Sequence, residues 1–588
     1  MAELDRSPAR GETGIAPSPD GKEVIVKKVL ASALAIVALA LSPLAAQVPV
    51  NLHGRSADGA NGVVAAAKPE ASQVGVDILK KGGNAVDAAI ATAFALGVLE
   101  PNASGVGGGG FMIIKLANMK EAVVVDFREC APAASTPDMY KFDEKGKVID
   151  NATFEGGLSV GVPGEVKGLL YAFDKFGSKK LSRAQVLQPA IDYAEKGYKV
   201  TVNLEQIIKD NFEKLKKFEN GGAIYFDGGL PYELGATIKN PDYAKTLKAV
   251  AAKGADAIYK GEIAKAIVDE VRKRGGILSL EDLANYQVKE RKPVVGTYRG
   301  YTIMSVPPAS SGGTHLVELL NIMENFDLAK TGEGTPATGH LWAEAMKLVF
   351  ADRSKYMADT DFVQVPLKGL ASKAYAKELA ALIAADKSMP SATAGDPSKY
   401  ESGSTTHLSV MDKAGNMVAI TKSINYFFGS GVVVPGWGII MNDHMDDFVP
   451  KPGSANSVEP GKRPLSSMSP TLVLDPKGRS FMTLGSPGAT RIFPTVAQVI
   501  SNIVDHGMSV QEAILAPRYF QMASGKLNVE GRVPINTYNA LGPLGHELAL
   551  KLDWDAYFGG VHAVLYDYDA KMLRGGADPR RDGQAAAY

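Results

Sequence analysis

The chain has 588 residues, and its 64 basic and 64 acidic side chains give a formal net charge of zero. That length exceeds the need of one ordinary domain, and the balanced charge argues against nucleic-acid binding through a basic surface. The single cysteine, Cys130, excludes an internal disulfide and a zinc site built on several thiolates. Its simplest interpretation is a small buried apolar side chain.

The N-terminal region has the pattern of an export signal. The basic pair Lys27-Lys28 precedes an apolar run over 29–41, and the small residues Ala45-Ala46 follow. This order is typical of a secretory signal peptide, and the run is short for a membrane span. Residues 1–23 are polar, which is unusual ahead of a signal, so we expect the natural start near residues 24–26. An uncleaved membrane anchor is the alternative interpretation.

Helices and strands are both expected in the first part of the chain. Helix-capping residues, Gly and Pro breakers and apolar periodicity set the expected bounds. They predict helices over 69–80, 85–99, 163–177 and 183–197, and strands over 111–116 and 122–127. The middle of the chain, to about residue 399, has a mostly helical pattern with short loops.

Strand patterns dominate after about residue 403. Alternating apolar runs joined by short Gly and Asn turns predict hairpins. The expected pairs are 406–412 with 417–425, 469–474 with 479–484, and 561–566 with 572–575, and a helix is expected over 491–504. Helices, then strands, then helices again suggest a layered α+β sandwich with the sheets inside.

Thr405 stands at the start of the first of these late strands. A hydroxyl is a weak nucleophile until a base takes its proton, and a threonine at a chain terminus can use its own α-amino group as that base. Thr405 is internal, so this role requires cleavage of the Ser404–Thr405 bond. Taken alone, Thr405-Thr406 indicates only β-propensity.

Other segments offer groups that such a nucleophile needs. The turn 485–489 links a strand to a helix, where backbone N–H groups can face an oxyanion. Arg128 ends a strand, and a guanidinium can hold a carboxylate through two hydrogen bonds. Ser466-Ser467 supplies adjacent hydroxyls and Asp446-Asp447 supplies two carboxylates. Each has an ordinary alternative, such as a tight turn or a solvated acidic loop.

Taken together, these motifs resemble those of the γ-glutamyltranspeptidases, which are N-terminal-nucleophile hydrolases. The resemblance runs from about residue 65 to 588. The ordered motifs that carry it are the glycine-rich run 105–110, Asp126-Phe127-Arg128-Glu129, Thr405-Thr406-His407, Asp446-Asp447-Phe448, the segment 462–470, Gly485-Ser486-Pro487-Gly488 and the ending 577–583.

The resemblance implies a role for each site residue. Thr405 would be the nucleophile for self-cleavage and turnover, supported by Ser423. The N–H groups of Gly488 and Ala489 would form the oxyanion hole. The remaining residues would bind substrate: Arg128, Ser466 and Ser467 its α-carboxylate, and Asp447 with Asn425 its α-amino group.

Three features depart from the family pattern. Ala489 replaces the usual glycine, and its N–H remains a donor if φ is negative. His444 stands where Gln or Glu is usual near the substrate ammonium. If it contacts that ammonium, its protonation near pH 6.5, where an unperturbed histidine titrates, should weaken binding; the alternative is a structural hydrogen bond. The segment between Phe448 and Lys462 is also shorter than in members with a lid loop.

The resemblance implies a four-layer αββα sandwich made from one precursor. Residues 1–46 would be the extension and signal peptide, 47–404 the large subunit and 405–588 the small subunit. The expected reaction transfers a γ-glutamyl group through a threonyl ester from a donor such as glutathione to water, an amino acid or a peptide. No metal, organic cofactor or nucleic acid is expected, and the location is periplasmic or secreted.

Two other functions remain open from the sequence. One is an acylase of the same fold that cleaves glutaryl side chains, or an enzyme that cleaves poly-γ-glutamate. A glutaryl group has no α-amino group, so Asp447 would have no cation to bind. The other is an uncleaved, inactive secreted binding protein.

Overall fold

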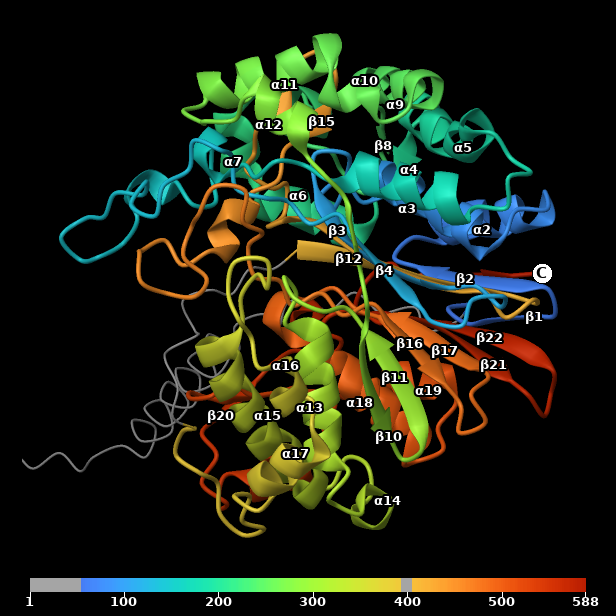
Figure 1. Ribbon diagram of the computed structural model, residues 1–588, viewed down its shortest axis with the longest axis vertical. Helices are drawn as coiled ribbons and strands as arrows, with labels where there is room; N and C mark the ends of the chain where they lie inside the picture. The colour runs from blue at the N-terminus through green and yellow to red at the C-terminus, as the bar shows by residue number, and fades with distance from the viewer. Residues whose placement is uncertain (1–53, 393–403) are drawn as a thin grey trace, which may run out of the picture. The chain divides into compact units, whose positions relative to one another are not determined.

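Two seven-stranded antiparallel sheets form the centre of the computed structural model, which describes residues 54–392 and 404–588 (Figure 1). The first sheet has the order β23-β2-β12-β13-β3-β4-β9. Its strands are β2 Gly62–Ala66, β3 Gly109–Lys115, β4 Val123–Asp126, β9 Lys289–Arg291, β12 Ser404–Asp412, β13 Met417–Asn425 and β23 Gln584–Ala587. The expected signal peptide lies outside the described residues.

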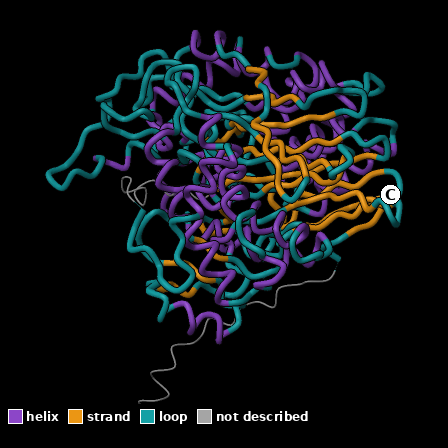
Figure 2. Tube along the Cα trace, turned by 60° about the horizontal axis from the view of Figure 1, so that its bottom comes forward, coloured by secondary structure: helices purple, strands orange, loops and turns teal. Residues whose placement is uncertain are grey.

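The second sheet has the order β1-β22-β21-β17-β16-β11-β10. Its strands are β1 Ala57–Gly59, β10 Val294–Tyr298, β11 Tyr301–Ser305, β16 Thr471–Leu474, β17 Ser480–Gly485, β21 His562–Asp567 and β22 Met572–Ala577. Figure 2 shows the strands gathered between helices that lie on both sides of them.

Helices form the two outer layers (Figure 1). Those on the side of the first sheet include α2 Pro69–Lys80, α3 Ala85–Leu99, α4 Glu165–Phe176, α5 Arg183–Lys196, α9 Pro241–Lys253 and α11 Gly261–Lys273. Those on the side of the second sheet include α13 Gly312–Met323, α15 Pro336–Tyr356, α17 Lys373–Ala380, α18 Ile492–Val504 and α19 Val510–Leu515. The four-layer αββα sandwich is therefore confirmed.

Shorter elements connect these layers. The helices are α6 Val202–Asp210, α7 Phe212–Lys217, α8 Glu219–Tyr225, α10 Asp256–Tyr259, α12 Leu280–Asn285, α14 Leu328–Thr331, α16 Leu367–Leu370 and α20 Ile535–Leu541. The strands are β5 Tyr198–Lys199, β6 Phe226–Asp227, β7 Leu230–Pro231, β8 Thr237–Ile238, β14 Val433–Val434, β15 Ile439–Ile440, β18 Tyr519–Phe520, β19 Leu527–Val529 and β20 Leu548–Leu550.

Both faces of the first sheet are buried. Val64 and Ala66 on β2 pack into the core beneath the helices, whereas Val63 and Ala65 pack into the core between the sheets. Successive side chains of a strand point to opposite faces, so a strand covered on both sides needs apolar residues at every position. This explains the near-continuous apolar runs of β2, β3 and β13.

Capping chemistry explains why several helices begin where the sequence predicts. Asn84 accepts hydrogen bonds from the N–H groups of Val86 and Asp87, and the Asp87 carboxylate accepts one from the N–H of Asn84. Ser182 and Gln185 cap α5 in the same reciprocal way. These side chains satisfy N–H groups that have no partner inside the helix. The predicted bounds of the first two helices match α2 and α3.

The prediction of a mostly helical middle region was incomplete. Residues 294–298 and 301–305 form the hairpin β10–β11 at one edge of the second sheet. Its two loop residues, Arg299 and Gly300, have φ values of 50° and 86°. Positive φ at both loop positions is the geometry that suits the right-handed twist of a two-residue hairpin. Arginine is an uncommon residue for that first position, so the turn lacks a strong sequence signal.

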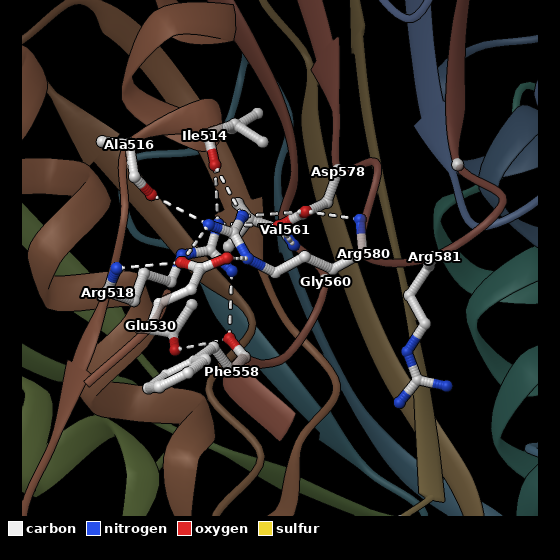
Figure 3. A network of polar contacts seen from close by, with 12 residues as sticks. Ile514, Ala516, Arg518, Glu530, Phe558, Gly560, Val561, Asp578, Arg580 and Arg581 are labelled. Atoms are coloured by element: carbon white, nitrogen blue, oxygen red, sulfur yellow. Dashed lines mark hydrogen bonds and ion pairs between the residues drawn. The ribbon is translucent and has the colours of Figure 1, made fainter. Parts of the chain in front are cut away.

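A buried ion-pair network anchors the C-terminal segment (Figure 3). Asp578 lies between Arg518 at 2.7 Å and Arg580 at 3.1 Å, and Arg580 lies 2.6 Å from Glu530. Figure 3 shows Arg581 extending away from this group. Asp578 and Arg580 lie between β22 and β23, so their ion pairs anchor the segment that leads into β23. That strand pairs with β2, which in turn pairs with β12.

In residues 54–392 and 404–588, no helix is both long and apolar enough to span a membrane.

Candidate active site

Thr405 lies at an irregularity between two central strands. On β12, Ser404 pairs with Asn425 and Thr406 pairs with Lys422, so Thr405 is the residue at which the register shifts. A bulge of this kind bends the strand and re-aims one side chain. The strand continues across the Ser404–Thr405 bond, and the Thr405 side chain is buried at 5% exposure.

Ser423 contacts the threonine from the neighbouring strand. The Thr405 hydroxyl donates to Ser423 Oγ at 3.4 Å, and Ser423 Oγ accepts from the N–H of Asn425 at 2.7 Å. Asn425 has φ of 77°, and its side-chain amide donates to the Asp443 carbonyl at 3.2 Å. The end of β13 therefore holds two of the expected residues next to Thr405.

A small pocket opens beside Thr405. The residues implied by the resemblance line it, except Ser423, which contacts Thr405, and Gly488, which precedes Ala489. The lining consists of Arg128, Arg353, Thr405, Asn425, His444, Asp447, Leu465, Ser466, Ser467, Met468, Ala489, Thr490 and Ile492. No residue between Phe448 and Lys462 belongs to this lining, although the structure describes that whole segment.

The expected oxyanion turn joins β17 to α18. Gly488 has φ of 127° and Ala489 has φ of 53°. The negative φ considered for Ala489 is therefore not observed, although its N–H group is present at any φ and lies at the pocket. An alanine in the left-handed region costs roughly 1–2 kcal/mol, whereas glycine adopts it freely. Ala489 still lines the pocket, but in a conformation that favours the usual glycine.

Arg128 and Asp447 form an ion pair within the pocket. Arg128 follows β4 and is fully buried, and its Nε donates to the Pro464 carbonyl at 3.3 Å. The side chain of Asp447 comes from the short turn after β15 and is 16% exposed. A guanidinium and a carboxylate thus lie side by side in one cavity.

His444 lines the pocket, and its Nδ1 lies 2.9 Å from Oε1 of Glu129 without the geometry of a hydrogen bond. Burial holds the pKa of His444 well below 6.5, and the charge of Arg128 adds to this effect. The expected titration near pH 6.5 is therefore wrong. Burial also raises the pKa of Glu129 to about 8, against the opposing effect of Arg128.

Arg353 is a pocket residue that the sequence analysis missed. It lies in the last turn of α15, where its Nη2 donates to Ser467 Oγ at 2.9 Å. A basic residue at the C-terminal end of a helix ordinarily complements the helix dipole, so its type and position gave no separate signal.

Another polar cluster lies outside the pocket. His340 and Glu344 on α15 gather with His546, and His340 Nδ1 lies 2.8 Å from His546 Nε2. These residue types can bind a metal ion. The ammonium of Lys347 already lies 2.8 Å from Glu344 and would repel a cation there. We interpret the cluster as structural.

Comparison of the chain with known proteins identifies its family. The family model described as gamma-glutamyltranspeptidase matches residues 71–588. The chain belongs to the γ-glutamyltranspeptidase family. The sequence resemblance is thus confirmed over nearly the whole described structure.

Relatives within the γ-glutamyltranspeptidase family have two kinds of name. The glutathione hydrolase proenzyme of Escherichia coli is 43% identical, covering 90% of this chain and 92% of that protein. The acylase ACY 1 proenzyme of Pseudomonas sp. is 42% identical, covering 91% and 94%. The crystal structure of cephalosporin acylase from Bacillus halodurans has a TM-score of 0.83 at 31% identity, covering 93% of this chain and 99% of that one. Overall similarity therefore does not separate the two substrate classes.

Proposed function

We propose that this chain cleaves itself before Thr405 and then hydrolyses or transfers γ-glutamyl groups. Glutathione is the proposed donor, with water, an amino acid or a peptide as acceptor. The observation that carries the proposal is the Arg128–Asp447 pair in the pocket that Thr405 lines. The far end of a γ-glutamyl group carries one carboxylate and one ammonium, which are the counter-charges of this pair.

Self-cleavage would begin at the register shift in β12. The Thr405 hydroxyl would attack the Ser404 carbonyl carbon, and the peptide nitrogen would leave as the Thr405 amine. Water would then hydrolyse the resulting ester. The products would be a large subunit ending at residue 404 and a small subunit of 405–588, held together by the sheet that both supply.

Turnover would use the newly formed amine. It would take the proton of Thr405 Oγ as that oxygen attacks the γ-carbonyl, and would return it to the leaving amine. N–H groups of Gly488 and Ala489 would stabilise the oxyanion, and Ser423 would hold the hydroxyl. Water or an amine would then release the acyl group from the ester.

Substrate binding would divide between the two sides of the pocket. Arg128, Ser466 and Ser467 would bind the α-carboxylate. Asp447 and Asn425 would bind the α-ammonium, with His444 beside them. A turnover assay with γ-glutamyl and glutaryl anilides tests this assignment, and faster turnover of the γ-glutamyl donor is expected.

A glutaryl acylase is the second candidate. Relatives named as acylases are about as similar to this chain as those named glutathione hydrolases. Faster turnover of the glutaryl anilide would favour this candidate. Because no residue between Phe448 and Lys462 lines the pocket, poly-γ-glutamate is also a donor to include. A single full-length band without activity would instead favour a binding protein.

We also propose that the protein is exported to the periplasm or the medium, on the basis of the pattern in residues 24–46. Sequencing the N-terminus of the mature large subunit tests this, and a start near Gln47 is expected.

A further inference from the structure

Arg353 brings a second guanidinium to the pocket. Its Nε donates to Ser311 Oγ at 2.9 Å and its Nη2 donates to Ser467 Oγ at 2.9 Å. Within residues 54–392 and 404–588, its third nitrogen, Nη1, has no hydrogen-bond partner, and no carboxylate lies within ion-pairing distance of the guanidinium. Burial lowers the pKa of Arg353 to about 10, with Asp447 opposing that effect, so the group stays charged at neutral pH.

Arg128 is in a different electrostatic state. Asp447 already neutralises it, and Glu129 Oε2 lies 3.5 Å from its Nη1. A partly buried cation without a counter-ion attracts an anion more strongly than one that is already paired. A carboxylate that enters the pocket is therefore attracted most strongly to Arg353, whose positive charge has no paired carboxylate among the described residues.

The serines of the pocket depend on the same side chain. Arg353 bonds directly to the hydroxyl of Ser467. It also holds Ser311, whose hydroxyl donates to the Ser466 carbonyl at 2.8 Å. The two serines expected to bind carboxylate are thus positioned from α15, through one direct contact and one indirect contact.

We propose that Arg353 binds the carboxylate of the acyl donor and restricts the substrates to acyl groups with a carboxylate at their far end. This inference deepens the proposed function, because it takes Thr405 as the nucleophile of the same pocket. For a γ-glutamyl donor, the ammonium engages Asp447 and frees Arg128 to share the carboxylate. For a glutaryl donor, the Arg128–Asp447 pair stays intact and Arg353 carries the carboxylate alone.

Three donors separate this role from a structural one. A γ-glutamyl anilide carries both charged groups, a glutaryl anilide keeps only the carboxylate, and a 4-aminobutanoyl anilide keeps only the ammonium. In Arg353→Gln we expect kcat/KM to fall roughly ten- to a hundredfold on the γ-glutamyl donor and further on the glutaryl donor, the loss of a charge-assisted hydrogen bond. The 4-aminobutanoyl donor should stay within about twofold of its own wild-type value, since it has no carboxylate to lose.

Two further variants control for folding. Arg353→Lys keeps the charge without the planar fork and should recover part of the loss. Arg574→Gln removes an arginine that pairs with Asp58 and Asp567 at the surface, and should leave all three donors unchanged. Gel analysis of self-cleavage normalises each rate to processed enzyme.

Binding measurements test Arg353 independently of turnover. Calorimetry should show that Arg353→Gln weakens glutarate binding at least about tenfold relative to wild type, with 4-aminobutanamide, which has an ammonium but no carboxylate, unaffected. Equal losses for both ligands, or unchanged glutarate binding, would overturn the proposal. If wild type binds glutarate but turns over neither carboxylate donor, the proposed function fails and the assignment of Arg353 stands.

Discussion

Arg128 and Asp447 lie 319 positions apart in the sequence and form an ion pair in the pocket beside Thr405. The pair brings the end of β4 to the turn after β15. Each charge is the counter-ion of the other within this polar cavity. If the pair binds substrate as proposed, a zwitterionic donor would exchange one ion pair for two.

The first prediction concerns the geometry of Arg128. Lysine keeps the charge but cannot donate from Nε to Pro464 and bind a carboxylate at the same time. Arg128→Lys should lower kcat/KM on γ-glutamyl anilide by roughly a hundredfold, the loss of two charge-assisted bonds. An unchanged kcat/KM would remove Arg128 from the site.

The second prediction follows from the Glu129–His444 contact. Below about pH 8, the protonated carboxyl of Glu129, close to Nδ1 of neutral His444, favours the tautomer with its proton on Nε2, which cannot accept from an ammonium. Above that pH, ionised Glu129 favours the tautomer with its proton on Nδ1, which leaves Nε2 as an acceptor. Binding of γ-glutamyl donors should therefore strengthen as pH rises through about 8.

Comparing donors isolates this effect. The ratio of kcat/KM for γ-glutamyl to glutaryl anilide, measured from pH 6 to 9, cancels the titration of the Thr405 amine. A glutamine at position 129 cannot ionise, so Glu129→Gln should remove the rise in this ratio with pH that ionisation of Glu129 causes. A ratio with the same rise in Glu129→Gln and wild type would contradict the account, because the rise would then belong to the substrate.

The third prediction tests the backbone at Ala489. Its φ of 53° favours glycine, while glycine also increases the entropy of the unfolded chain. Ala489→Gly should leave the free energy of unfolding unchanged or raise it by up to about 1 kcal/mol. The same change at Ala497, inside α18, should lower it by about 1 kcal/mol or more. Equal destabilisation at both positions would show that φ at Ala489 is not the determinant.

Much of the fold follows from local sequence signals. Asn84 and Ser182 cap helices, and the late hairpins have polar turns between apolar runs, so these elements were predicted within a few residues. The hairpin β10–β11 was missed because its turn begins with Arg299 and the surrounding segments have helical patterns. The order of strands in the sheets could not be predicted from local sequence signals, because pairings such as β2 with β23 join segments from the two ends of the described chain.

In the candidate site, too, some residues could be identified from the sequence and others could not. Motif residues such as Arg128 and Asp447 could be named because the family pattern marks their positions. Arg353 could not, because its role depends on α15 lying against the loop that carries Ser467. The low pKa of His444 depends on burial, which a sequence position does not reveal.

The fourth prediction concerns the C-terminal network. Although burial alone would raise it, Arg518 and Arg580 hold the pKa of Asp578 well below its usual range. A lowered pKa contributes stability that is present above about pH 4 and is lost as pH falls through the folded-state value. Asp578→Asn should cost about 3–5 kcal/mol of unfolding free energy at pH 7, because it leaves buried Arg518 without its carboxylate, although Arg580 keeps Glu530.

A surface pair provides the matched control. Asp567→Asn disturbs an exposed pair with Arg574 and should cost less than about 1 kcal/mol. The difference between wild type and Asp578→Asn should shrink as pH falls below about 4, as measured by chemical denaturation. A constant difference across that range would contradict the linkage.

The most direct test of the account is the N-terminus of the small fragment, read by intact-mass and terminal sequencing of the purified protein. We predict two chains, the smaller beginning at Thr405 and ending at Tyr588. Thr405→Ala should remain one inactive chain, and Thr405→Ser should cleave more slowly because only the hydroxyl is retained. A small fragment that begins at any other residue, or γ-glutamyl turnover by an uncleaved chain, would contradict the central claim.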